Sequence, residues 1–240
     1  MLLANKTAIV YGAAGWIGSA VARAYAREGA VVHVAGRTRA TLEQVAERIR
    51  DEGGTAHVAP LDVLDPARAQ AHADAVAATG GIDICFNATS NDDVQGTELV
   101  GLPFEDFMRP VTKSVTAHFN ISTAVAPHMI ERRRGVILVM AGGREAIPRL
   151  GGSHVAWAAL AGLCRQLAAE LGPHGIRAAW LLSPGSPDHG GQADEAAGGL
   201  LPDRRPTYDE VANVAVFASS DWAATMTATE LNFTAGAVVD

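Results

Sequence analysis

The sequence predicts an α/β protein with a doubly wound parallel sheet of about seven strands and helices on both faces. Short runs rich in β-branched residues alternate with longer segments of helical periodicity, which is the pattern of repeated strand–helix–strand units. A glycine-rich turn separates the first strand from the first helix. Right-handed crossovers then predict the strand order 3-2-1-4-5-6-7, with the switch of direction between strands one and four.

Each element follows from its length and periodicity. The expected strands are Thr7–Tyr11, Val31–Ala35, Thr55–Ala59, Ile82–Phe86, Val136–Met140, Arg177–Leu182 and Glu230–Phe233. The expected helices are Ile17–Glu28, Ala40–Asp51, Pro66–Ala78, Glu105–Arg133, Ser153–Leu171 and Tyr208–Ser219. Pro110 and Pro127 interrupt the fourth helical segment, so we expect a kink at the first and a late turn at the second.

Length and composition favour one soluble domain over residues 1–240. The 240 residues are 48% hydrophobic, which suits a single large core. A net charge of −7 does not favour nucleic-acid binding. No apolar run approaches about 18 residues, so we expect no membrane association and a cytoplasmic location. Cys85 and Cys164 are expected to be small core residues, and no residue cluster has the spacing of a metal site.

The turn after the first strand carries the main binding signal. It is Tyr11-Gly12-Ala13-Ala14-Gly15-Trp16-Ile17-Gly18, and a helix follows directly. Glycines at such a turn let the backbone approach a pyrophosphate at the helix N-terminus, as in Rossmann-type dinucleotide-binding domains. The alternative is a tight strand-to-helix turn that binds nothing.

The end of the second strand predicts which dinucleotide is preferred. An acidic residue here would bond the ribose 2′-hydroxyl of NAD, but the chain has Gly36. Arg37 and Arg39 follow and offer positive charge suited to a 2′-phosphate, so NADP(H) is the expected cofactor. The alternative is that these arginines are simply solvated at a helix start, above all Arg39.

Further segments, in the right order along nearly the whole chain, resemble the short-chain dehydrogenase/reductase family. They are Leu61-Asp62-Val63, Asn87-Ala88-Thr89-Ser90, the helix from Ala158 to Leu171, Ser183-Pro184-Gly185 and the end from Asn232 to Gly236. The first turn, with Trp16, is more similar to the extended branch of that superfamily. The resemblance implies cofactor contacts from Gly12, Ala14, Gly15, Trp16, Ile17, Gly18, Arg37, Asp62, Val63, Asn87, Ala88, Pro184 and Gly185.

The same resemblance indicates that the usual chemistry is altered. The family works with an Asn, Ser, Tyr and Lys tetrad, in which tyrosine is the acid–base group. Carried across by position, the four sites here are Ser114, Gly142, Ser153 and Trp157. The chain holds only Tyr11, Tyr25 and Tyr208 with Lys6 and Lys113, and none of these forms a Tyr-x-x-x-Lys pair.

Three residues are candidate substitutes. His154 is next to the tyrosine position and histidine titrates near neutrality, although an exposed histidine at a helix start is the alternative. Arg144 follows strand five and could hold a substrate carboxylate, or pair with Glu145 in solvent. Ser153 could bond a substrate or serve as the helix N-cap. His118 is expected to face the packing partner of the fourth helix, and Asp188 and His189 lie in a glycine-rich stretch that could cover a site.

Three functions remain open. The first is an NADP(H)-binding oxidoreductase with an altered active site and a small carbonyl or alcohol substrate. The second is a non-redox lyase, cyclase or isomerase on the same scaffold, and the third is a catalytically silent nucleotide-binding protein or partner subunit. The family resemblance also implies a homodimer or homotetramer, with the helices around Thr112–Ala126 and Val155–Leu171 paired across a two-fold axis.

Overall fold

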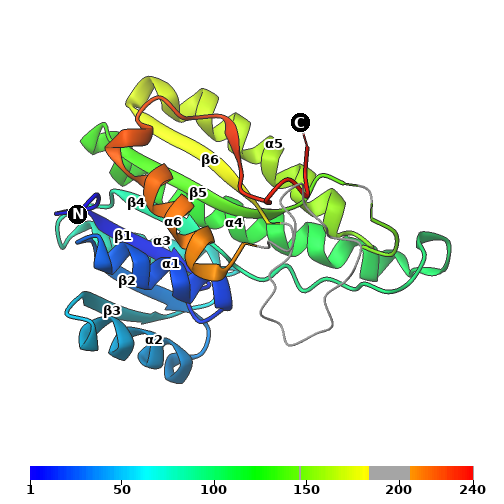
Figure 1. Ribbon diagram of the computed structural model, residues 1–240, viewed down its shortest axis with the longest axis horizontal. Helices are drawn as coiled ribbons and strands as arrows, with labels where there is room; N and C mark the ends of the chain where they lie inside the picture. The colour runs from blue at the N-terminus through cyan, green and yellow to red at the C-terminus, as the bar shows by residue number, and fades with distance from the viewer. Residues whose placement is uncertain (146, 184–205, 240) are drawn as a thin grey trace.

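The computed structural model of the chain describes residues 1–145, 147–183 and 206–239. Within them, seven parallel strands form one sheet in the order β3-β2-β1-β4-β5-β6-β7 (Figure 1). The strands are β1 Thr7–Tyr11, β2 Val31–Gly36, β3 Thr55–Pro60, β4 Ile84–Asn87, β5 Gly135–Gly142, β6 Ile176–Ser183 and β7 Thr229–Asn232. The predicted fold class and strand order are confirmed, and each strand lies within two residues of its expected bounds.

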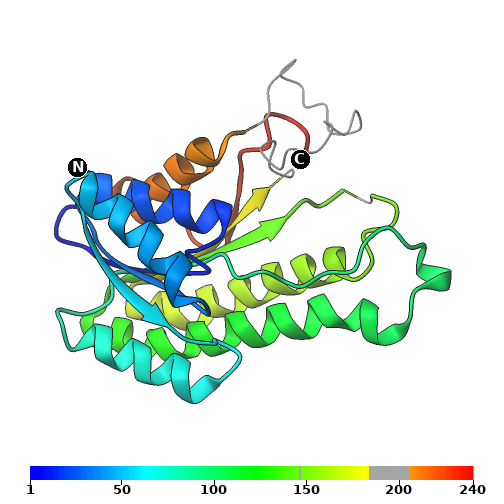
Figure 2. The same cartoon turned by 90° about the horizontal axis from the view of Figure 1, so that it is seen from below.

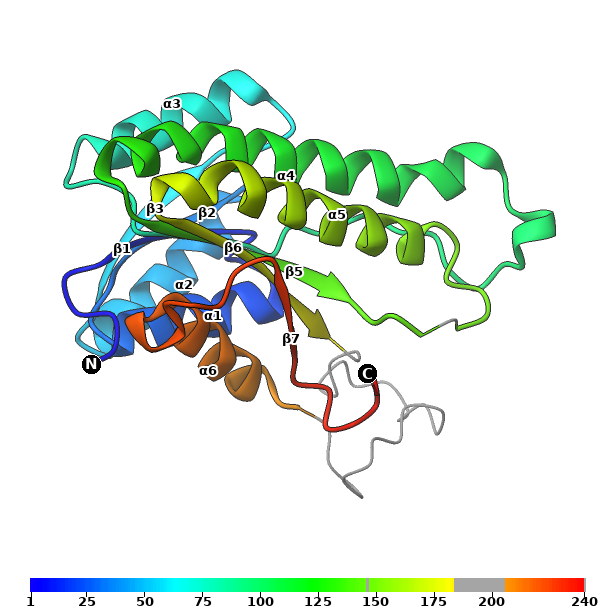
Figure 3. The same cartoon turned by 90° about the horizontal axis from the view of Figure 1, so that it is seen from above.

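Helices cover both faces of the sheet. They are α1 Trp16–Arg27, α2 Arg39–Asp51, α3 Pro66–Ala77, α4 Phe104–Arg132, α5 Ser153–Leu171 and α6 Tyr208–Ser219. Helices α3, α4 and α5 lie on one face and α1, α2 and α6 on the other (Figure 3). Short 3-10 turns complete the described chain at η1 Leu99–Gly101, η2 Gly172–His174 and η4 Asp221–Ala223.

Alternation along the central strands divides the core into two layers. On β1, Val10 packs into the cluster under α1 and α2, whereas Ile9 and Tyr11 pack into the cluster under α3 and α4. Successive side chains of a strand point to opposite faces, so a strand covered on both sides must be apolar at every position. This explains why the strand segments are continuous hydrophobic runs.

Helix α4 differs from the expectation at its second proline. It continues through Pro110 and Pro127 and ends at Arg132, and Arg133 follows in the left-handed conformation with φ 51°. The predicted late turn at Pro127 is therefore wrong. Val125 and Met129, on either side of that proline, are both buried in the same core cluster. Burial on both sides holds the helix together although one backbone hydrogen bond is lost.

All strands run in one direction, so their carboxyl ends share one edge of the sheet. Helices α4 and α5 extend past this edge, and the segments after β4 and β5 run alongside them (Figure 2). In an open parallel sheet this edge is the ligand-binding edge, at the point where the strand order reverses. None of the described helices is long and apolar enough to cross a membrane.

Candidate functional site

The glycine turn brings the end of β1 close to the end of β4. Gly12 has φ +76°, and a Cβ there would lie 2.4 Å from the carbonyl oxygen of Ala88. A Cβ on Gly18 would lie 2.2 Å from the carbonyl oxygen of Gly12. Neither distance is physically accessible, so both glycines are required for the close approach of strand, turn and helix.

Gly15 has a different role in this turn. It is the N-cap of α1 without a side-chain hydrogen bond, and a Cβ there would meet only the carbonyl oxygen of Gly12, at 3.4 Å. Because glycine has no side chain, Gly15 does not cap the first N–H groups of α1, and Gly15 is exposed to solvent. Such a helix start suits an anionic group.

Two cavities meet at this turn. The smaller, of about 230 Å³, lies over the ends of β1 and β2, and the larger, of about 940 Å³, lies over β4 and β5. Both are lined by Gly15, Ala88, Thr89 and Ser90. The shared residues set the two cavities next to one another along the carboxyl edge, across the switch point between β1 and β4.

The smaller cavity contains most of the residues expected around the adenosine half of a dinucleotide. Its walls include Gly12, Ala14, Gly15, Gly36, Arg37, Asp62, Val63 and Ala88. The Arg37 side chain is exposed, whereas Arg39 forms an ion pair with Glu43 at 3.3 Å and is not among the described residues of this cavity. A carboxylate oxygen of Asp62 accepts a hydrogen bond from the Leu64 N–H at 3.0 Å, which orders the loop after β3.

Lys113 also lines the smaller cavity, and sequence reasoning gave it no role. It lies on α4 directly before Ser114, and its ammonium group is 3.3 Å from a carboxylate oxygen of Asp92. Only the fold shows that this segment of α4 faces the end of β1. The smaller cavity is therefore lined by two basic residues, Arg37 and Lys113, of which Lys113 is paired with Asp92.

The end of β4 presents buried polar atoms without partners. The Oδ1 of Asn87 accepts a hydrogen bond from the Thr89 N–H at 3.1 Å, and the Asn87 amide nitrogen has no hydrogen-bond partner among the described residues. The Thr89 hydroxyl is also buried and has no partner in the described ranges, and Thr89 lines both cavities. Buried polar atoms are costly unless a partner arrives, so these atoms fit a site that receives a polar ligand.

Three of the four positions expected for the catalytic tetrad line the larger cavity. Ser114, Gly142 and Trp157 are all on its wall, together with Trp16, Ile17 and Gly18 of the turn. A Cβ on Gly142 would lie 2.2 Å from Cε2 of the Trp157 indole. The indole therefore occupies the volume that a serine side chain at position 142 would need.

Ser153, at the fourth position, is fully buried and is not among the described residues of the cavity wall. Its hydroxyl donates to a carboxylate oxygen of Asp93 at 2.9 Å, on the segment after β4. The N-cap of α5 is Gly152, not Ser153, so the N-cap interpretation of Ser153 is wrong. The contact with Asp93 joins residues 60 apart in the chain and has no local sequence signal.

The two other candidate substitutes lie at the margins. His154 is half-buried with its ring centroid 6.5 Å from that of Trp157, and it is not among the described residues of the cavity wall. Arg144 pairs with a carboxylate oxygen of Glu230 at 2.8 Å. The indole N–H of Trp180 donates to the same Glu230 carboxylate, so Arg144 belongs to a bridge between β5, β6 and β7.

The buried residue with the clearest relation to the larger cavity is His118. It is 1% exposed, lines that cavity, and its Nδ1 is 2.8 Å from the carbonyl oxygen of Ser114. Its Nε2 is buried and has no hydrogen-bond partner within the part of the chain that the structure describes. Burial lowers the pKa of His118 to about 4, although the bond to Ser114 opposes this shift.

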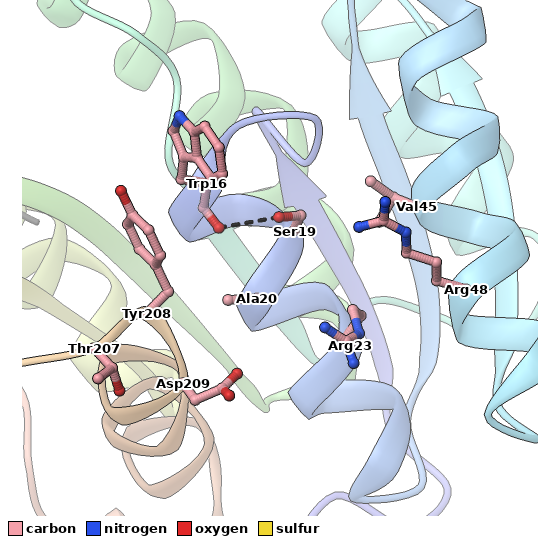
Figure 4. A pocket seen from close by; sticks show the side chains of 9 residues that line it. All are labelled: Trp16, Ser19, Ala20, Arg23, Val45, Arg48, Thr207, Tyr208 and Asp209. Carbon is pink, nitrogen blue, oxygen red and sulfur yellow. Dashed lines mark hydrogen bonds between the residues drawn. The ribbon is translucent and has the colours of Figure 1, made fainter. Parts of the chain in front are cut away.

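A separate groove of about 250 Å³ lies on the outer side of the turn, between α1, α2 and α6 (Figure 4). The rings of Trp16 and Tyr208 stack here, with centroids 5.8 Å apart and planes at 12°. Both residues also line the larger cavity, so the stacked pair forms the wall between groove and cavity. Trp16 thus joins the glycine turn to the start of α6.

Four residues singled out in the sequence lie outside the described residues: Pro184, Gly185, Asp188 and His189. Within residues 1–145, 147–183 and 206–239, no group of three or more His, Cys, Asp or Glu residues could hold a metal ion.

The fold and the joined cavities define a Rossmann-type protein with an open site at the carboxyl edge, and comparison with known proteins gives the family. The profile of the family described as enoyl-(acyl carrier protein) reductase matches residues 12–237. D-threitol dehydrogenase of Mycolicibacterium smegmatis is 33% identical over 95% of this chain and 91% of its own length. Dehydrogenase/reductase SDR family member 4 of Sus scrofa is 32% identical over 76% of this chain and 66% of its own length.

Solved structures agree with these sequence relatives. A short-chain dehydrogenase/reductase family protein is 27% identical, with a TM-score of 0.83 over 98% of both chains. A short-chain type dehydrogenase/reductase from Mycobacterium ulcerans, at 21% identity and a TM-score of 0.91 over 99% of this chain and 91% of that chain, shares the fold. The chain belongs to the short-chain dehydrogenase/reductase family of oxidoreductases, whose members normally bind NAD or NADP.

Proposed function

We propose that the protein is an NADP(H)-dependent oxidoreductase that acts on small alcohols or carbonyl compounds with an altered acid–base apparatus. The observation that carries this proposal is the junction of the two cavities at Gly15, Ala88, Thr89 and Ser90. A dinucleotide needs one continuous path with an anion-binding helix start near its middle, and this junction offers both.

The residues of the smaller cavity fit the adenosine half. Arg37 would hold the 2′-phosphate, and Asp62 and Val63 would contact the adenine. The start of α1, where Gly15 provides no side-chain cap, would receive the pyrophosphate. The buried Thr89 hydroxyl gains a polar partner when the path is filled. NADP(H), when bound, supplies or accepts the hydride.

The larger cavity accounts for the altered chemistry. Trp157 stands where the family has its lysine, and an indole N–H donates a hydrogen bond but does not titrate. Gly142 offers no hydroxyl, and the Ser153 hydroxyl is engaged with Asp93. Positioning of substrate beside the nicotinamide is then the main contribution of the protein, and the proton passes through water, the substrate or His154.

The substrate class follows from the cavity and from a relative. The walls combine apolar side chains such as Met140 and Leu160 with the polar Ser114 and His118. A neutral compound with few carbons and several hydroxyl groups matches this mixture. A relative at 33% identity is a dehydrogenase of D-threitol, which supports the same class.

The test is direct binding of the cofactor. Titration with NADPH and NADH, followed by nucleotide fluorescence, is expected to give a saturable NADPH signal. A protein that binds neither nucleotide contradicts the proposal. A variant at Thr89, which lies outside the expected tetrad positions, tests the same binding. Thr89→Val removes the buried hydroxyl with little change in volume and should weaken NADPH binding.

A catalytically silent nucleotide-binding protein is the second candidate, and Trp157 is the observation that favours it. The lysine of the family also holds the nicotinamide ribose, and the indole in its place cannot do so as a cation. NADPH binding without turnover on any polyol, ketone or quinone of a broad panel would favour this candidate over the oxidoreductase.

The expected assembly is also a proposal. Phe104 and Phe119 of α4 and Val155 of α5 are large apolar side chains that remain exposed on the helices that the family pairs across a two-fold axis. A homodimer or homotetramer would cover them. Light scattering at micromolar concentration is expected to give a multiple of 24.9 kDa, and a monomer contradicts the proposal.

A further inference from the structure

His118 is held in one orientation and one tautomer by its own helix. Its Nδ1 is 2.8 Å from the carbonyl oxygen of Ser114, one turn earlier on α4. A carbonyl oxygen only accepts hydrogen bonds, so Nδ1 carries the proton and donates it. The Nε2 atom of the neutral ring is then a lone-pair acceptor.

This acceptor has no partner within the described chain. The Nε2 atom is buried and makes no hydrogen bond, in a side chain that is 1% exposed. A buried acceptor in this state is destabilising, and most such atoms in proteins are bonded. Because His118 lines the larger cavity, a molecule in that cavity is the available source of a donor.

The Nε2 atom of His118 stays unprotonated over the physiological pH range. Burial lowers the pKa of His118 to about 4, so the ring is neutral at pH 7 and Nε2 does not become a donor. A lone pair in a buried position repels a carboxylate and attracts an O–H or N–H group. Met140, Ala141 and Leu160 on the same wall suit the carbon skeleton of such a ligand.

We propose that Nε2 of His118 accepts a hydrogen bond from a hydroxyl group of the substrate and so selects hydroxylated substrates over those without a hydroxyl donor. The proposal deepens the oxidoreductase assignment above and rests on it for the identity of the larger cavity as the substrate site. It assigns His118 to substrate recognition, in direct contact with the bound molecule.

The experiment uses two probes that differ in one group. Acetoin (3-hydroxybutan-2-one) has a hydroxyl donor, and butan-2-one is similar in size but has none. Each is titrated into protein labelled with ¹⁵N at histidine, alone and saturated with NADPH, and His118→Phe identifies the His118 signals. Acetoin is expected to shift the Nε2 resonance of His118 towards that of a hydrogen-bonded nitrogen, and butan-2-one to leave it in place.

Affinity supplies the second measurement. His118→Phe, without an acceptor, should weaken acetoin binding about three- to tenfold, which is the range of one hydrogen bond, and should not weaken butan-2-one binding. His118→Gln has an amide oxygen near the Nε2 position and should keep most of the affinity for acetoin. His33→Phe is the matched control, since His33 is also a buried histidine but lies on β2 outside the described cavity walls.

Two outcomes overturn the proposal. One is an Nε2 resonance that responds equally to both probes, or to neither up to the highest concentration at which the protein stays folded. The other is an equal loss of affinity for both probes in His118→Phe. NADPH fluorescence on the same samples separates this result from failure of the assigned function. The spectra of the unmodified protein decide the question even where a variant does not fold.

Discussion

The indole of Trp157 fills the space in front of Gly142, so that a Cβ at position 142 would lie 2.2 Å from Cε2 of the ring. Positions 142 and 157, where the family resemblance leads us to expect two of the four tetrad residues, are thus physically coupled: the large side chain on α5 requires the absence of one on β5. A change at either position alone is resisted by the other, because a packed interior has no spare volume.

Stability should report this coupling. Gly142→Ala is expected to lower the free energy of unfolding by about 1–3 kcal/mol through overpacking. In the Trp157→Ala background the same change should cost much less, and urea unfolding of the four proteins gives the coupling energy. Gly162→Ala is the control, because a Cβ on this glycine of α5 meets nothing within 4 Å. Additive effects of the changes at 142 and 157 would show that the indole does not occupy this space.

The preference for NADP(H) should depend on Arg37. Arg37→Ala is expected to weaken NADPH binding about tenfold or more and to leave NADH binding almost unchanged, since a charge-assisted hydrogen bond contributes about 1.5–3 kcal/mol. Arg39→Ala is the matched control, because Arg39 pairs with Glu43 and is not among the described residues of the cavity. Equal affinities of the unmodified protein for the two nucleotides would contradict this prediction.

Carbonyl reduction should be slow. General acid catalysis contributes about 10²–10⁴-fold, so steady-state rates with simple ketones and quinones should fall below those of typical family members by about this factor. His154→Ala tests one remaining route, and activity that persists unchanged across pH removes His154 from it. Family-typical rates in the unmodified protein would mean that an effective acid lies elsewhere.

Restoration of the tetrad should meet a structural obstacle. Ser153→Tyr places a large ring at a fully buried position whose hydroxyl is bonded to Asp93. Combined with Trp157→Lys, it is expected to lower the free energy of unfolding by about 1–3 kcal/mol or more from overpacking. Thermal and urea unfolding measure this loss. A double variant as stable as the unmodified protein would show that the segment containing Asp93 shifts at little cost to make room for the tyrosine ring.

Acid should destabilise the protein between about pH 6.5 and 4. Burial lowers the pKa values of His33, His72 and His118 to about 4, against about 6.5 in the unfolded chain. Between these values the unfolded chain binds more protons, so the stability present above pH 6.5 is lost as the pH falls towards 4. The loss is about 1–2 kcal/mol per histidine by pH 5. Urea unfolding at several pH values measures the slope, which His33→Phe should reduce; an unchanged slope in that variant argues against a neutral buried His33.

The sequence alone determined the order, type and approximate bounds of the strands and helices, because periodicity, glycine and proline act over a few residues. It also located the strand-to-helix turn from its glycines. In the structure, the nearby carbonyl group of Gly12 leaves no room for a side chain at Gly18, and the carbonyl group of Ala88 after β4 leaves none at Gly12. It misjudged Pro127, because burial of Val125 and Met129 outweighs one lost hydrogen bond.

Only the tertiary structure decided which side chains meet at the site. The contact of Ser153 with Asp93, the seating of Trp157 against Gly142 and the presence of Lys113 in the smaller cavity all join elements distant in the chain. In the sequence His118 is an ordinary helix residue. That its Nε2 lacks a partner among the described residues and that the residue lines a cavity follow only from the packing of β4, β5 and α4. Packing between segments distant in the chain gives no periodic pattern in the sequence. This packing decides which buried polar atoms lack a protein partner and so can bind a ligand.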